Sequence, residues 1–142
     1  MNLAIVGYGK MGQLIDELSP QYGFTTQLRL DEFNNPAQAM MTPEHFAGID
    51  VAIEFSTPET CVANIRRLAE LKINTVVGTT GWLAHLDEVR ALIAAQDTGF
   101  VWSPNYSIGV NVFSRLVAEA ARWLANENEY EAWAWEIHHS QK

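Results

Sequence analysis

Gly7, Gly9 and Gly12 constrain the fold of this chain more than any other residues. They directly follow the apolar run of residues 3–6, and such a run ended by glycine is typical of a strand buried on both faces. After them, apolar residues recur at helical spacing, at Met11, Leu14, Ile15 and Leu18. We expect this helix to end near Ser19-Pro20. The sequence therefore predicts a strand, a tight glycine turn and an amphipathic helix, in that order.

Strands and helices continue to alternate up to about residue 102. The expected strands lie at residues 24–30, 50–55, 74–77 and 100–102. The segment Ser56-Thr57-Pro58-Glu59 combines a capping-box pattern with an early proline, which predicts the start of a helix. A further helix is marked by Leu86, Val89 and Ile93. This alternation predicts right-handed βαβ units and a mostly parallel sheet.

The pattern changes near residues 105–109. Beyond them, one stripe of a long helix is marked by Ile108, Val112, Leu116, Ala120 and Leu124, and residues 129–139 alternate like a strand. Such a strand would need a sheet that the preceding residues do not supply. We therefore expect residues 1–106 to form an α/β, doubly wound parallel domain and residues 107–142 to begin a second, α+β domain for substrate binding and oligomerisation.

Charge and composition exclude several classes of function. The net charge is -8, with 17 acidic against 9 basic residues, which argues against a nucleic-acid partner. No apolar run approaches the roughly 20 residues that cross a bilayer, and no basic leader precedes the first strand, so we expect no membrane partner and a cytoplasmic location. Cys61 is the single cysteine, and its helical position favours a packed thiol over a nucleophile.

The glycine segment has a chemical interpretation because it lies between a strand and a helix. Gly7 permits a tight turn, Gly9 lets the backbone approach a pyrophosphate, and Gly12 allows close packing of the helix on the sheet. The free N–H groups of the helix N-terminus then face the phosphates. We predict a dinucleotide site that includes Gly7, Tyr8, Gly9, Lys10, Met11 and Gly12; the alternative is a structural glycine turn.

Asp31 ends the second strand about 20 residues after the glycine segment, where an acid accepts hydrogen bonds from the adenosine ribose. Its charge would repel a 2'-phosphate, although Arg29 lies two residues earlier and would offset that repulsion. The cofactors we predict are NADH and NADPH, with NADH preferred. The alternative is that Asp31 simply begins a turn.

Three more strands end in small polar loops, at residues 56–57, 78–81 and 103–106. Ligands of an open parallel sheet lie beyond the carboxyl ends of its strands, so we expect these loops to converge on one crevice. The predicted nicotinamide contacts are Gly78, Thr79, Thr80, Ser103, Pro104, Asn105 and Tyr106. Turn preference alone is the alternative for each loop considered singly.

The last residues contain His138, His139 and Lys142. In a continued strand the two histidines would point to opposite faces, which makes them a poor chelating pair, and we predict no metal site. Histidine or lysine supplies the proton that hydride delivery to an imine requires. From spacing alone, a catalytic role and the end of a half-buried strand remain equally open.

Five segments together resemble the dihydrodipicolinate reductase family, whose members catalyse a step in the diaminopimelate route of lysine biosynthesis. They occur in the family's order at residues 7–12, 54–59, 77–81, 103–111 and 136–142. The last two, Ser103-Pro104-Asn105-Tyr106-Ser107-Ile108-Gly109-Val110-Asn111 and Glu136-Ile137-His138-His139-Ser140-Gln141-Lys142, are the most specific. The first is shared by Rossmann-like domains in general.

The resemblance implies a Rossmann-like fold and an NAD(P)H-dependent oxidoreductase that reduces a small cyclic dicarboxylate, 4-hydroxy-tetrahydrodipicolinate, to tetrahydrodipicolinate. It implies that His138 is the proton donor or acceptor, that Lys142 is the proton donor, that His139 binds a substrate carboxylate, and that the enzyme is a homotetramer. The family's substrate loop and remaining sheet do not follow Lys142, so we expect these 142 residues to be part of a longer enzyme; the alternative is a shortened homologue. Another Rossmann-type imine or sugar reductase and a non-catalytic nucleotide-binding module are the alternatives.

Overall fold

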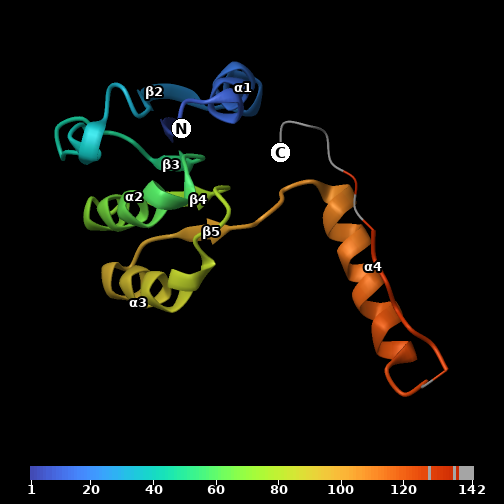
Figure 1. The fold of residues 1–142 in the computed structure, drawn as a ribbon. Coiled ribbons are helices and arrows are strands. Elements are labelled where there is room, and N and C mark those ends of the chain that lie inside the picture. The colour runs from blue at the N-terminus through green and yellow to red at the C-terminus, as the bar shows by residue number, and fades with distance from the viewer. Residues whose placement is uncertain (128, 136, 138–142) are drawn as a thin grey trace. The chain divides into compact units, whose positions relative to one another are not determined.

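A computed structural model describes residues 1–127, 129–135 and 137 of the chain (Figure 1). The chain divides into two compact units, Met1–Pro104 and Asn105–Lys142. Among the described residues, the first contains all five strands, and the second contains one long helix.

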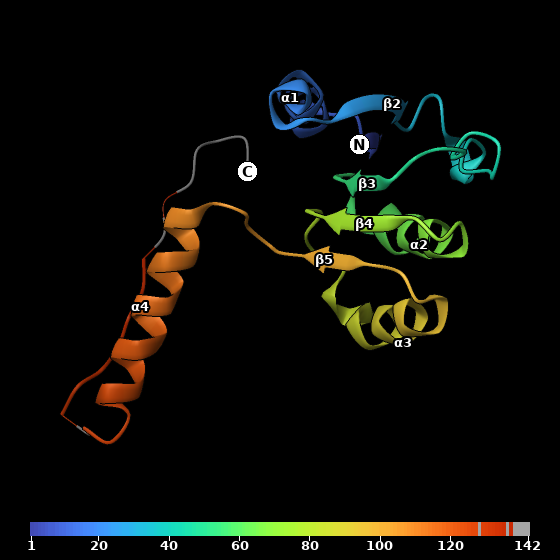
Figure 2. The same ribbon diagram turned by 180° about the vertical axis from the view of Figure 1, so that it is seen from behind.

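The first unit is built on a parallel sheet that has five strands in the described part of the chain. The strands are β1 (Asn2–Val6), β2 (Thr25–Leu30), β3 (Val51–Glu54), β4 (Asn74–Val77) and β5 (Phe100–Trp102). Their order is β2-β1-β3-β4-β5, and Figure 2 shows them from behind. From β1 the chain adds β2 on one side of the sheet and then β3, β4 and β5 on the other. The direction in which strands are added therefore reverses between β1 and β3. This switch point, beyond the carboxyl ends of β1 and β3, is where sheets of this kind bind ligands.

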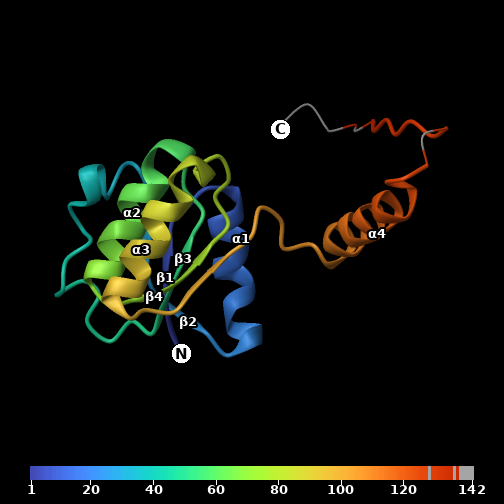
Figure 3. The same ribbon diagram turned by 90° about the horizontal axis from the view of Figure 1, so that it is seen from below.

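Helices cover both faces of the sheet, as Figure 3 shows: α1 (Lys10–Leu18) on one and α2 (Pro58–Glu70) with α3 (Leu86–Gln96) on the other. Three short 3-10 helices, η1 (Ser19–Tyr22), η2 (Pro36–Gln38) and η3 (Leu83–His85), lie between these elements. The predicted doubly wound, Rossmann-like sheet is confirmed. Helix α1 ends where the sequence predicted, and η1 continues the chain from Ser19.

Two apolar clusters form the core of this unit. One centres on the middle strands and contains Ala4, Val6, Leu30, Met41, Phe46, Ile49, Ala52, Leu68 and Ile73. The other joins α2, β4 and α3 through Cys61, Ile65, Val77, Trp82 and Val89. Cys61 is completely buried, which confirms the prediction of a packed thiol.

The capping box predicted at Ser56 is wrong. Thr57 is the N-cap of α2, no side chain caps that helix, and the Ser56 hydroxyl instead donates a hydrogen bond to Glu54. Ser56 lies one residue before that N-cap, and its side chain is directed to the buried carboxylate and not to the helix amides. Pro58 does occupy the first turn, as predicted.

The second unit contains α4 (Ile108–Leu124), which confirms the long helix. Its N-cap is Ser107, whose Oγ accepts a hydrogen bond from the Val110 amide at 3.5 Å. The strand predicted over residues 129–139 is wrong for residues 129–135 and 137, which form no strand. Alternating side chains alone do not make a strand, because its backbone groups need a neighbouring strand. Residues 128, 136 and 138–142 lie outside the described part.

No helix in the described ranges combines the length and the apolar character that a membrane crossing requires.

Candidate dinucleotide site

The three glycines after β1 have three different environments. Gly7 has φ +96°, and a Cβ added there would lie 2.2 Å from the Phe55 carbonyl oxygen. A Cβ on Gly12 would lie 2.3 Å from the Gly7 carbonyl oxygen. A Cβ on Gly9 would meet nothing within 4 Å. Gly7 and Gly12 are therefore required by the protein's own packing, whereas the open side of Gly9 leaves room for a ligand.

The turn delivers the start of α1 to the carboxyl edge of the sheet. The Gly7 amide donates to the Leu30 carbonyl oxygen at 2.8 Å, and the Phe55 amide donates to the Val6 carbonyl oxygen at 2.8 Å. Gly9 is the N-cap of α1 and supplies no side chain to cap it. The first N–H groups of the helix, with their partial positive charge, are suited to an anionic group.

A cavity of about 440 Å³ lies at this edge, at the switch point between β1, β2 and β3. Its lining consists of Val6, Gly7, Tyr8, Gly9, Leu30, Asp31, Glu32, Phe33, Asn35, Pro36, Ala37, Gln38, Phe55, Ser56, Thr57, Thr60 and Asn64. Asp31 and Glu32 give it two carboxylates, and none of these described lining residues is Lys, Arg or His. The size and position suit the adenosine half of a dinucleotide.

Asp31 both starts a turn and faces this cavity. Its Oδ1 accepts hydrogen bonds from the amides of Phe33 and Asn34, each at 2.9 Å. Within the described residues, Oδ2 has no recorded hydrogen bond. The two interpretations of Asp31 are compatible, because one oxygen fixes the turn and the other can accept from a ribose hydroxyl.

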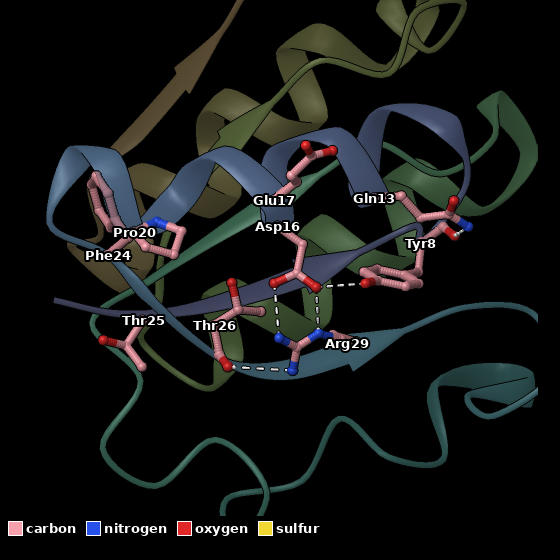
Figure 4. Close-up of a pocket in the computed structure, with 9 residues that line it drawn as sticks. All are labelled: Tyr8, Gln13, Asp16, Glu17, Pro20, Phe24, Thr25, Thr26 and Arg29. Atoms are coloured by element: carbon pink, nitrogen blue, oxygen red, sulfur yellow. Dashed lines mark hydrogen bonds and ion pairs between the residues drawn. The ribbon is translucent and has the colours of Figure 1, made fainter.

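Arg29 does not line that cavity; it belongs to a second one, of about 610 Å³, between α1 and β2 (Figure 4). There its guanidinium forms an ion pair with Asp16, and the Tyr8 hydroxyl donates to the same carboxylate at 2.5 Å. These bonds, those from Arg29 above all, hold the pKa of Asp16 well below its usual range. The suggestion that Arg29 offsets a 2'-phosphate is not supported, because Asp16 already neutralises it.

The loop after β4 is tightly packed against Phe55. A Cβ on Gly78 would lie 2.0 Å from the Phe55 ring. Thr79 is 8% exposed; its hydroxyl donates to Glu54 at 2.6 Å, and its carbonyl oxygen accepts from Trp82 Nε1 at 2.9 Å. The Thr79 hydroxyl that we expected at a carboxamide is thus directed into the protein, whereas Thr80 is exposed.

The structure brings only part of the predicted set together. Gly7, Tyr8, Gly9 and Asp31 line the 440 Å³ cavity, whereas Lys10, Met11, Gly12, Gly78, Thr79 and Thr80 do not. Ser103 and Pro104 belong to the first unit, and Asn105 and Tyr106 to the second. The predicted catalytic residues His138 and Lys142 and the predicted carboxylate ligand His139 lie outside the described residues.

Sequence reasoning missed Glu54, which is fully buried at the end of β3. The available signal was its position, since a glutamate that ends a buried strand of a parallel sheet lies at the ligand-binding edge. Among the described residues, no group of three or more His, Cys, Asp or Glu side chains is arranged to hold a metal ion.

Comparison with known proteins identifies the family. Residues 1–106 match the family described as "Dihydrodipicolinate reductase, N-terminus". This chain belongs to the dihydrodipicolinate reductase family. The resemblance found in the sequence is thereby confirmed, and the glycine loop and cavity lie within the matched region.

Several similar proteins are named 4-hydroxy-tetrahydrodipicolinate reductase. The one from Christiangramia forsetii is 36% identical over all of this chain and 57% of its own length. The one from Ralstonia nicotianae is 33% identical over all of this chain and 60% of its own length. A third, from Wolbachia sp. subsp. Brugia malayi, is 37% identical over 68% of this chain and 34% of its own length. The chain thus spans about three fifths or less of these relatives' own lengths.

Proposed function

We propose that this chain forms the cofactor-binding part of an enzyme that reduces 4-hydroxy-tetrahydrodipicolinate to tetrahydrodipicolinate in the diaminopimelate route of lysine biosynthesis. The observation that carries the proposal is the contrast among the three glycines. Two are required by internal contacts, and the third, Gly9, is open at the N-terminus of a helix in a chain of this reductase family. The substrate follows the names of the relatives, and the product and pathway follow the family resemblance.

The described residues fit a nicotinamide dinucleotide. The backbone at Gly9 and the first turn of α1 would hold its pyrophosphate, and Asp31 would accept from its adenosine ribose. The loops at residues 78–80 and 103–106 would hold its nicotinamide end. When bound, the cofactor supplies the hydride that the reduction requires.

NADH is the cofactor that this site favours. A 2'-phosphate on the adenosine ribose would approach the carboxylates of Asp31 and Glu32, and like charges repel at close range. Arg29 is held by Asp16 in the other cavity. We therefore propose that NADPH binds, but more weakly than NADH.

Proton transfer is the part of the reaction that we assign to the last residues. Hydride addition to a conjugated imine leaves negative character on the substrate, and His138 or Lys142 would neutralise it by donating a proton. His139 would bind a substrate carboxylate through a charge-assisted hydrogen bond. We also propose that the full-length enzyme is a cytoplasmic homotetramer, by analogy with its family.

The test is a steady-state assay of the full-length protein with NADH and freshly prepared substrate. We expect His138→Ala to lower kcat by about 10²- to 10⁴-fold while the Kd for NADH stays within about two-fold. His45→Ala is the control, because His45 is exposed and lines neither cavity. A folded wild-type protein that binds NADH but never oxidises it with this substrate would contradict the proposal and favour a non-catalytic nucleotide-binding role.

A further inference from the structure

Glu54 is an acidic residue with 0% exposure on β3, the central strand of the sheet. It ends β3, where its backbone pairs with Val6 on one side and Val77 on the other. Within the described part of the chain, no Lys, Arg or His is bonded to its carboxylate. A buried carboxylate without a cation is costly unless hydrogen bonds satisfy it.

Four neutral side chains supply those hydrogen bonds. Oε1 accepts from the Ser56 hydroxyl and from Asn64 Nδ2, the latter at 3.1 Å. Oε2 accepts from the Thr79 hydroxyl at 2.6 Å and from the Cys61 thiol at 3.3 Å. Burial, and then the negative charge of Glu54, raise the pKa of the Cys61 thiol, which therefore remains protonated and able to donate.

These donors come from separate elements of the first unit. Ser56 follows β3 and Asn64 lies on α2, and both side chains line the 440 Å³ cavity. Thr79 belongs to the loop after β4, whose Gly78 amide also donates to the Glu54 carbonyl oxygen at 2.9 Å. Asn64 extends the network to η2, since its Oδ1 accepts from Gln38 Nε2 at 3.3 Å.

We propose that Glu54 is a positioning residue for the cofactor, which rests on the function proposed above. Its carboxylate joins the loop after β3, helix α2 and the loop after β4. These hydrogen bonds would hold the residues around the adenosine and those around the nicotinamide at a fixed distance and orientation from one another. Glu54 does not line the cavity itself, and it acts through Ser56, Asn64 and Thr79. A purely structural role would affect the stability of the fold without a selective effect on cofactor affinity.

Thr79→Val and Thr75→Val in the full-length protein separate these two roles. Both threonines are buried, with 8% and 3% exposure, and valine replaces each hydroxyl with a methyl group of similar size. Thr79 bonds to Glu54, whereas the Thr75 hydroxyl donates to the carbonyl oxygen of Ile73, just before β4, at 3.0 Å and away from the site. We expect Thr79→Val to raise the Kd for NADH about five- to ten-fold and Thr75→Val to change it less than about two-fold.

Glu54→Gln tests the centre of the network. Its amide NH2 must face either the Ser56 and Asn64 pair or the Thr79 and Cys61 pair, so the hydroxyl of that pair has to turn from donating to accepting, and its present hydrogen bond to residue 54 is lost. We expect about a ten-fold rise in the Kd for NADH, and the double variant Glu54→Gln/Thr79→Val should bind NADH within about two-fold of Glu54→Gln alone.

The outcomes distinguish the two proposals. If the wild-type protein fails to bind NADH, the proposed function fails and the role of Glu54 fails with it. If the wild type binds NADH but folded Thr79→Val and Glu54→Gln bind it equally well, only the role of Glu54 is overturned. Should Glu54→Gln not fold, the Thr79→Val and Thr75→Val pair decides by itself, because equal affinities for NADH in those two variants contradict positioning through Thr79.

Discussion

Arg29 and Asp16 form a two-point ion pair between β2 and α1. Arg29 Nε donates to Asp16 Oδ2 at 2.6 Å, and a terminal guanidinium nitrogen donates to Oδ1 at 2.8 Å (Figure 4). The Tyr8 hydroxyl donates to Oδ2 as well, so the pair also orients a side chain of the glycine loop. The arginine nearest to Asp31 in the sequence is thus engaged away from the ribose end of the site.

This ion pair predicts a pH-dependent contribution to stability. The pKa of Asp16 is lower in the folded chain, so its stabilisation is present above the unfolded-state pKa of about 3.9 and is lost as the pH falls towards the folded-state pKa. Because Arg29 is 43% exposed, we expect Asp16→Asn to lower the free energy of unfolding at pH 7 by no more than about 1 kcal/mol.

Urea unfolding at pH 7 and pH 3 checks this prediction. The free energy of unfolding should differ less between wild type and Asp16→Asn at pH 3 than at pH 7, because Asp16 of the unfolded chain is mostly protonated at pH 3. Asp87→Asn is the control, since the Asp87 side chain is fully exposed and its contact with Arg90 is 3.6 Å long. An equal difference at both pH values would show that the ionised carboxylate contributes nothing.

Asp31 should set both the affinity for NADH and the discrimination against NADPH. Asp31→Asn retains an oxygen for the turn but removes the charge, so we expect the Kd for NADH to rise about five- to ten-fold. The ratio of the Kd for NADPH to the Kd for NADH should fall, because a repulsive charge is lost. Fluorescence titration with both cofactors measures these changes, with Asp87→Asn as the exposed control; an unchanged ratio would refute the assignment.

Gly7 and Gly23 form a matched pair for stability. Both have positive φ, +96° and +78°, but a Cβ on Gly23 meets nothing within 4 Å, whereas one on Gly7 meets the Phe55 carbonyl oxygen at 2.2 Å. Gly23→Ala should cost about 1 to 2 kcal/mol from backbone strain alone. Gly7→Ala should cost more than about 3 kcal/mol, because overpacking is added. Denaturant unfolding measures both costs, and similar values would disprove the steric role of Gly7.

The alternating pattern predicted the sheet well because its signals are local. Local signals act through the backbone of neighbouring residues, as do the apolar run of residues 3–6, the glycines after it and Pro58. The strand, the turn and the start of α2 can therefore be predicted from the sequence. The strand predicted beyond residue 129 failed for its described residues because pairing partners are not a local property.

The site was less predictable because its key contacts join distant residues. Glu54 and Thr79 are 25 positions apart, and Asp16 and Arg29 are 13 apart. No spacing rule shows that a hydroxyl expected at the cofactor is instead bonded to a buried carboxylate, or that a cation expected at a phosphate is already paired. The first pairing depends on how the loop after β4 packs against β3, and the second on how α1 packs against β2.

Gly9→Ala in the full-length protein tests the central claim, dinucleotide binding at the loop after β1, most directly. The new methyl group meets no protein atom within 4 Å, and in the control Gly109→Ala the nearest atom is 3.8 Å away. Gly9 is a helix N-cap and Gly109 lies in the first turn of α4, so each change should alter the free energy of unfolding by no more than about 1 kcal/mol. The methyl group would, however, occupy the approach of the pyrophosphate, and we predict that calorimetry shows a Kd for NADH at least about ten-fold higher than wild type. A folded Gly9→Ala protein that binds NADH as tightly as wild type would contradict the account.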